Sequence, residues 1–422
     1  MTDNVPYPPS TPPVPPPAGP HPQAGPHPPA GPHPQAGPHP PAGPADAPAG
    51  PFAPGTPAGP QAPAGPGVAS GPHGQAGPHI PAAPLAPGAP AGPDPLTPLP
   101  GLRFGSSYRT PRTRWWRGVL SIAVVIVAVL LFSIVLSVVA VAIDMLLGLQ
   151  DPEAMIEGRI SMTPAMLAAT NLSLIAAAAL SLIAHRFING VRVGYFHSVA
   201  PGLRWGWMWL SFALVAPLYL LFAASSFLDP AYQTLTFSGT TLAFFFVIIL
   251  TTPLQAAAEE YMFRGVIQRS VGSWIRSPRW SFIVGTAASA AVFSAAHFAA
   301  DIWLIVYYLL FGVLLSILTQ RTGGVEAAIA IHTANNLFLL LVSAVTGQMD
   351  AGFDRSAGVG GPVMLVPVVI LAVVLLVLSW VGKRHRLTTV TGGEAITADA
   401  AGPGTALPSA SPWTGSGQQA GE

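Results

Sequence analysis

The chain has 422 residues, of which 50% are hydrophobic and only 8% are charged. A soluble domain averages about 25% charged residues, so this composition predicts a polytopic membrane protein rather than a water-soluble one. The formal net charge of +1 gives no indication of nucleic-acid binding, and we expect no nucleic-acid partner. The chain has no cysteine, which excludes a disulfide framework, a thiolate metal site and a cysteine nucleophile.

Residues 1–110 are rich in proline, glycine and alanine, and residues 18–41 read AGPHPQAGPHPPAGPHPQAGPHPP. This segment has almost no aromatic or β-branched residues with which to build a core, so it is predicted to be a disordered cytoplasmic tail. The repeated histidines either bind a metal weakly or are duplicated within a spacer, and we favour the spacer: His21, His27, His33 and His39. We expect no secretory signal here, because the first long apolar run begins too late. Residues 387–422 are predicted to form a second disordered tail.

Between the tails, residues 111–386 contain about eight apolar runs with lengths suited to about 30 Å of hydrocarbon. Each run must be helical, because lipid offers no other partner for the backbone of an isolated span. The predicted fold is therefore an all-α, polytopic membrane helix bundle of about eight transmembrane helices. The runs are 118–143, 164–184, 207–226, 240–262, 283–300, 302–319, 325–346 and 363–381.

The distribution of arginine predicts how the bundle is oriented. Basic residues gather before the first run, after every second run and after the last: Arg112, Arg114, Arg117, Arg186, Arg192, Arg204, Arg269, Arg276, Arg279, Arg321 and residues 383–386. The opposite loops are mostly acidic, apart from Arg159 and Arg355. The positive-inside rule therefore predicts a multi-pass protein of the plasma membrane, with the lipid bilayer as a partner and both termini in the cytoplasm.

The fourth run ends in EEYMFR, residues 259–264, and each ionised side chain at membrane depth costs about 3 kcal/mol on insertion scales. Glu260 and Arg264 have the i, i+4 spacing of an intrahelical ion pair. Consecutive helical positions differ by about 100°, so we expect Glu259 and Glu260 to face different partners. Glu259 is then left without a compensating charge, which makes it a candidate general base.

Two later runs carry further polar residues. His297 lies one helical turn after Phe293, and His332 and Asn336 lie on one face of the seventh run. One intramembrane histidine is explained equally well by a neighbouring helix that satisfies it. Polar residues occur on the fourth, fifth and seventh runs. If their roles were only structural, three separate runs would each carry costly polar side chains at membrane depth for unrelated reasons, so the combination favours a functional site.

These residues also form recognisable motifs. EEYMFR at 259–264, FSAAH at 293–297 and HTANN at 332–336 resemble the EExxxR, FxxxH and HxxxN motifs of the CPBP family of intramembrane proteases. That family includes the CAAX prenyl endopeptidases and bacterial relatives linked to bacteriocin processing or self-immunity. The motifs occur in the family's order, and the resemblance covers about residues 240–345.

The resemblance implies an intramembrane endopeptidase that acts on a membrane protein or peptide. Its implied catalytic residues are Glu259, Glu260, His297, His332 and Asn336, supported by Arg264 and Phe293. Glu259 would activate a water that His297 holds, and His332 and Asn336 would stabilise the oxyanion.

Zinc is the cofactor that the resemblance suggests, with Glu259, His297 and His332 as candidate ligands. The HExxH motif is absent, so no helix carries a two-histidine zinc site, and a metal-free mechanism is the alternative.

Counting residues puts Glu259 and His332 at similar depths but places His297 roughly 10 Å nearer the far side. The fifth segment is therefore either long, with its start outside the hydrocarbon near Arg279 and Trp280, or tilted or broken, and we favour the long segment. Two other functions fit the polar residues less well. A proton- or ion-coupled transporter would be expected to show an inverted repeat or paired broken helices. A catalytically silent, immunity-type scaffold would not need the full Glu, His and Asn set.

Overall fold

The computed structural model describes residues 94–392, in which every regular element is a helix, apart from two isolated β-bridges. The all-α prediction is therefore confirmed. The histidine repeat and most of the two predicted tails fall on residues 1–93 and 393–422, which lie outside the described range.

All eight predicted runs are helices. They are α1 (Trp115–Leu146), α3 (Pro164–Ile183), α4 (Trp205–Ala224), α5 (Gly239–Glu260), α7 (Pro278–Ala295), α8 (Ile302–Thr322), α9 (Glu326–Val345) and α11 (Leu365–Arg384). Shorter helices connect them: α2 (Pro152–Ile156), α6 (Arg269–Trp274), α10 (Met349–Phe353), the π-helices η2 (Ala184–Ile188) and η6 (Tyr261–Gln268), and the 3₁₀ turns η1 (Phe104–Ser106), η3 (Val193–Phe196), η4 (Ser225–Leu228), η5 (Pro230–Tyr232) and η7 (Pro362–Met364).

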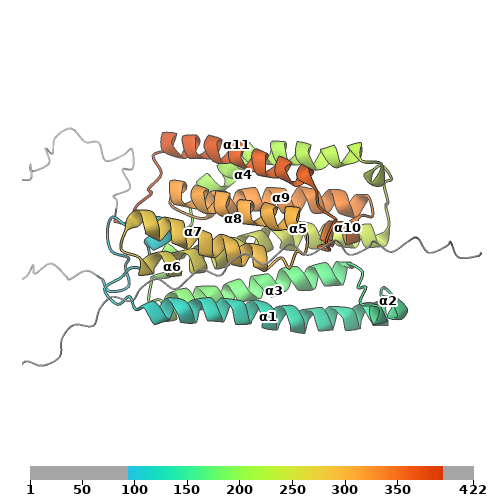
Figure 1. Ribbon diagram of the computed structural model, residues 1–422, viewed down its shortest axis with the longest axis horizontal. Coiled ribbons are helices and arrows are strands. Elements are labelled where there is room, and N and C mark those ends of the chain that lie inside the picture. The colour runs from blue at the N-terminus through green and yellow to red at the C-terminus, as the bar shows by residue number, and fades with distance from the viewer. Residues whose placement is uncertain (1–93, 393–422) are drawn as a thin grey trace, which may run out of the picture. The chain divides into compact units, whose positions relative to one another are not determined.

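Within residues 94–392, seven helices are long and apolar enough to cross a membrane, so the chain is a multi-pass membrane protein. Helix α7 is not among them, and Figure 1 shows that it ends near the middle of the length of α1. Small residues explain this difference from the predicted eight spans. A Cβ added to Gly312 of α8 would lie 2.9 Å from the Cα of Ala290 in α7, so the two helices pack almost backbone to backbone.

Helix α5 continues without a break through η6 into α6, which gives one apolar helical stretch from Gly239 to Trp274. The π-helical turns begin at Tyr261, directly after the two adjacent glutamates. Such turns shift the directions of all later side chains on a helix and occur frequently at functional sites. Here they carry the buried Arg264 and separate the glutamate pair from the buried Arg269.

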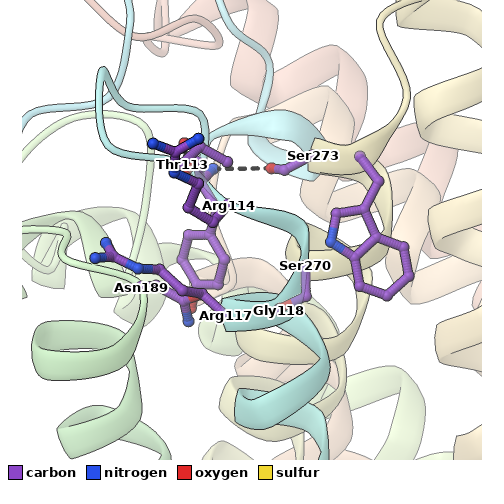
Figure 2. A pocket seen from close by; sticks show the side chains of 9 residues that line it. Thr113, Arg114, Arg117, Gly118, Asn189, Ser270 and Ser273 are labelled. Carbon is purple, nitrogen blue, oxygen red and sulfur yellow. Dashed lines mark hydrogen bonds between the residues drawn. The ribbon is translucent and has the colours of Figure 1, made fainter.

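The start of the described chain is folded onto the end of this long helix. Phe104 is fully buried, and the Tyr108 amide donates a hydrogen bond to Ser273 Oγ at 3.1 Å (Figure 2). The buried guanidinium of Arg269 lies 4.8 Å from the Phe104 ring centroid and 4.1 Å from that of Tyr108. These are cation–π contacts that hold the segment in place.

The end of the described chain meets the same segment. The Thr391 hydroxyl accepts a hydrogen bond from the Leu102 amide at 3.0 Å. Residues 94–110 and 387–392 are thus ordered, whereas the sequence assigns them to disordered tails. The amino-acid composition does not predict this packing. Two aromatic side chains, Phe104 and Tyr108, suffice to anchor residues 94–110 on Arg269, and composition does not reveal that contact.

The main hydrophobic core lies among α4, α8, α9 and α11, with Leu315, Leu318, Ile331 and Leu378 fully buried in it. An ion pair fixes the start of α9 in this core. Arg204 NH2 lies 2.6 Å from Oε2 of the fully buried Glu326. Helix α9 is therefore held at a defined depth, and this depth sets the position of His332 one and a half turns later.

Candidate active site

The predicted ion pair between Glu260 and Arg264 is present at the centre of the bundle. Both side chains are fully buried, and Arg264 NH1 donates to Glu260 Oε1 at 2.9 Å. Arg264 NH2 also donates to the carbonyl oxygen of Gly312 at 3.2 Å, and its guanidinium lies 4.8 Å from the Phe293 ring centroid. These contacts compensate one carboxylate and connect α5 to α7 and α8.

His332 on α9 contacts both glutamates. Its Nδ1 lies 2.8 Å from Glu260 Oε1, and its Nε2 lies 3.7 Å from Glu259 Oε2. The expectation that the two carboxylates face different partners is therefore wrong. The angle of about 100° between consecutive helical positions still holds, but an imidazole presents nitrogens on two sides and reaches both carboxylates.

The contact with Glu260 determines where the proton on His332 lies. An ionised carboxylate only accepts hydrogen bonds, so Nδ1 must be the donor. In the neutral ring, Nε2 then carries a lone pair that faces Glu259 Oε2. His332 Nε2 and Glu259 Oε2 would then both be acceptors and could not bond to each other directly. A proton or a water between them would satisfy both atoms.

Glu259 has one engaged oxygen and one without a partner. Its Oε1 accepts a hydrogen bond from Gln255 Nε2 at 2.5 Å. Its Oε2 is buried and has no hydrogen-bond partner among the described residues. Two hydrogen bonds of about 2.8 Å can span up to about 5.6 Å, so one water can contact both Oε2 and His332 Nε2.

Gln255 is the residue that the sequence analysis missed. It lies one turn before Glu259 on α5 and accepts a hydrogen bond at Oε1 from Asn336 Nδ2 at 3.3 Å. The sequence does contain a signal for Gln255. Its amide is a polar group at membrane depth, which is costly, and it has i, i+4 spacing to Glu259. Asn336 therefore reaches Glu259 through Gln255.

His297 lies just beyond the last residue of α7, Ala295, and approaches from the other side of Phe293. Its Nδ1 donates to the Phe293 carbonyl oxygen at 2.8 Å, which leaves Nε2 available as an acceptor. Its ring stacks on Tyr308 with centroids 3.8 Å apart. The Phe293 ring lies 4.6 Å from His297 and 6.0 Å from His332, so it touches both histidines.

The register of α7 differs from the prediction. The helix runs from Pro278 to Ala295 instead of 283–300, so the early start near Arg279 and Trp280 is confirmed. The expected long segment is wrong, because the helix has 18 residues and ends before His297. The turn after it contains Phe298 with a positive φ of 49° and leads to Asp301. Asp301 Oδ1 caps α8 by accepting from the amides of Trp303 and Leu304 at 2.8 and 3.1 Å.

The proposed zinc ligands are not arranged as a metal site. Across residues 94–392, no three His, Asp or Glu side chains are grouped so that they could hold a metal ion. Zinc needs ligand atoms at about 2.0–2.2 Å, whereas Glu259 and His332 are 3.7 Å apart and each uses its other polar atom for a different partner. The residues present do not fit zinc in this arrangement, and the zinc prediction depends on the motif resemblance alone.

Comparison with known proteins agrees with the motifs. Residues 239–338 match the family model described as Type II CAAX prenyl endopeptidase Rce1-like. This range contains all three motifs, so the resemblance is confirmed for this segment.

A relative from Bacillus subtilis (strain 168), described as "Uncharacterized protein YyaK", is 28% identical over 156 residues. The aligned part is 34% of this chain, and the chain spans about half of the length of that relative. No solved structure matches the chain.

Proposed function

We propose that this chain, whose residues 239–338 match the Rce1-like family, is an intramembrane endopeptidase that hydrolyses a peptide bond of a membrane-associated protein or peptide. The observation that carries the proposal is the buried Glu259 Oε2, which has no hydrogen-bond partner within residues 94–392 and faces His332 Nε2 at 3.7 Å. An unsatisfied buried polar atom costs about 1–3 kcal/mol, and more when it is charged. A catalytic water between the two atoms accounts for that cost.

In the proposed reaction, the water oxygen forms a bond to the substrate carbonyl carbon while its proton moves to Glu259 Oε2. The electrons of the carbonyl double bond move to the oxygen and form the tetrahedral oxyanion. When the oxyanion collapses, the C–N bond breaks and the proton on Glu259 passes to the leaving amine. The products are a carboxylic acid and an amine, and Glu259 is regenerated.

His297, His332 and Asn336 have separate roles in this proposal. A water has two O–H donors, so one bonds to Glu259 Oε2 and the other bonds to either His332 Nε2 or His297 Nε2. We assign His297 the role of orienting the water when the second O–H turns from His332 to His297 Nε2. Asn336 keeps one N–H beyond the one it donates to Gln255, and we assign that N–H to the oxyanion. His332 can donate from Nε2 to the oxyanion only while it holds the proton taken up by Glu259, and this proton returns to Glu259 before it passes to the leaving amine.

The proposed orientation places both termini in the cytoplasm of a cell whose plasma membrane holds the bundle, as the arginine distribution indicates. Helix α9 starts at Glu326 on this side, so His332 lies about 9 Å further along the helix axis. The reaction would then take place in the cytoplasmic half of the membrane.

The test compares membrane proteomes from cells that express the wild type or Glu259→Ala. We expect new protein N-termini that appear only with the wild type, and cleavage of the same site by the purified enzyme. Equal turnover by purified Glu259→Ala would overturn the mechanism. Ion flux in proteoliposomes without any cleavage would favour the transporter instead.

A further inference from the structure

Three side-chain amides form a continuous chain that ends on Glu259. Asn335 Nδ2 donates to Asn336 Oδ1 at 3.0 Å, and Asn336 Nδ2 donates to Gln255 Oε1 at 3.3 Å. Gln255 Nε2 then donates to Glu259 Oε1 at 2.5 Å. The chain crosses from α9 to α5 and connects the two helices that carry the candidate base and the histidine opposite it.

The direction of the chain follows from the carboxylate at its end. Ionised Glu259 can only accept, so Gln255 must present its NH₂ group and keep its carbonyl for Asn336. Asn336 must in turn present its NH₂ group, which leaves its carbonyl for Asn335. Every donor therefore points toward Glu259, and aligned amides polarise one another.

This arrangement favours the ionised form of Glu259 and fixes its rotation. Hydrogen bonds donated to a carboxylate stabilise its charged form. Gln255, Asn335 and Glu259 are 7%, 6% and 6% exposed and Asn336 is partly buried, so water competes little for the contact between Gln255 and Glu259. With Oε1 held by Gln255, the other oxygen is the one directed at His332.

The far end of the chain lies inside the protein. Asn335 Oδ1 is buried and has no partner among the described residues. A buried amide with an unsatisfied carbonyl lowers the stability of the fold. The presence of Asn335 is therefore best explained by the contact that its NH₂ group makes. Its side chain donates to Asn336, which starts the series of amides, and also lies within hydrogen-bond reach of the Tyr307 hydroxyl.

We propose that Gln255 and Asn335 are positioning residues for the hydrolysis, and that together with Asn336 they hold Glu259 Oε1 and turn Oε2 toward the water. This inference rests on the proposed function. Neither residue is a fixed position of the three motifs, and each acts through another residue. Asn336 accordingly supports the base as well as the oxyanion.

The experiment measures kcat, KM and the pH profile of kcat for the purified full-length wild type, Asn335→Ala, Asn335→Asp and Gln255→Leu. Asn335→Asp keeps the shape of the side chain and removes the donor but adds a carboxylate, so Asn335→Ala is the variant that isolates the loss of the donor. Asn171→Ala is the matched control. Asn171 is also a buried amide that bonds to α5, through Thr251 at 2.7 Å, but it does not belong to the hydrogen-bonded series of amides that ends on Glu259.

We expect both Asn335 variants to lose about tenfold in kcat, and Gln255→Leu about 100-fold, with KM changed less than about twofold. The acid side of the kcat profile should move to higher pH in all three variants. Asn171→Ala should leave the profile in place. A merely structural role for Asn335 would reduce the amount of folded enzyme without moving the profile.

An unchanged kcat and pH profile in both Asn335 variants would overturn this inference while the proposed function stands. The same profile shift in Asn171→Ala would also overturn it, because the effect would then not be specific to the chain. No cleavage by the wild type would instead overturn the proposed function, and this inference with it.

Discussion

The imidazole of His332 bridges two glutamates that are adjacent in sequence, with Nδ1 2.8 Å from Glu260 and Nε2 3.7 Å from Glu259. The two carboxylates thereby receive different environments. Glu260 is paired with Arg264 and fixes the histidine, while Glu259 keeps an oxygen that has no partner in the part of the chain that the structure describes. One of the two is thus held as a fixed charge and the other is left for proton transfer.

Replacing Glu259 tests the base directly. Glu259→Gln keeps the volume and can still bond to Gln255, but it cannot take a proton from water. We expect kcat to fall by about 10²–10⁴-fold, the usual contribution of a general base. Turnover of a peptide substrate in detergent measures this effect, with exposed Glu157→Gln as the control. A loss below about tenfold would assign the base to another group.

His297→Ala tests whether this histidine belongs to the site despite its position beyond α7. We expect loss of cleavage with retained membrane insertion, because the variant removes the ring nitrogen Nε2 that the proposal assigns to the water. Tyr308→Leu should have a smaller effect on kcat, since it removes the stack but keeps the imidazole. Wild-type kcat in His297→Ala would remove the residue from the mechanism.

Arg264→Met should destabilise the bundle by about 3–5 kcal/mol, because it leaves Glu260 buried without its counter-charge. Thermal unfolding in detergent measures the change. The double variant Glu260→Gln/Arg264→Met should regain much of the lost stability but not the activity, since His332 then loses its charged acceptor. If the single and double variants are equally unstable, the ion pair is not the cause.

Metal analysis separates the two mechanisms that the motifs leave open. Since Glu259, His297 and His332 are not grouped as ligands, we expect purified protein to contain well under one equivalent of zinc. Turnover should persist after dialysis against a chelator. One zinc per chain that is lost in both His297→Ala and His332→Ala would contradict the arrangement described above.

Truncation tests where the folded domain begins. Deletion of residues 2–93 should leave the thermal unfolding of the bundle unchanged. Deletion of residues 2–105 removes Phe104 from the buried Arg269 and should lower the melting temperature, as should Phe104→Ala in the full chain. Loss of a buried phenylalanine costs about 3–5 kcal/mol. Equal melting temperatures for the two truncations would show that the segment around Phe104 is dispensable.

The sequence predicts those features that depend on one helix at a time. The helices are predictable because lipid leaves the backbone no alternative, and the Glu260–Arg264 pair because both residues share α5 and the turn after it. The bridge made by His332 depends on how α9 is rotated against α5, which no single-helix pattern contains. The same holds for the stack of His297 on Tyr308. The π-helical turns after Glu260 could not be foreseen, because no proline or glycine pattern marks their start.

The local nature of the Glu260–Arg264 pair also matters while the protein is being made. His332 follows Glu260 by 72 residues, so the long helix Gly239–Trp274 leaves the ribosome well before this partner exists. An i, i+4 pair forms within the helix itself as soon as the helix forms. It can therefore reduce the cost of moving two opposite charges into the bilayer before α8 and α9 are synthesised. The pair that later orients the histidine thus first serves the biogenesis of the span that carries it.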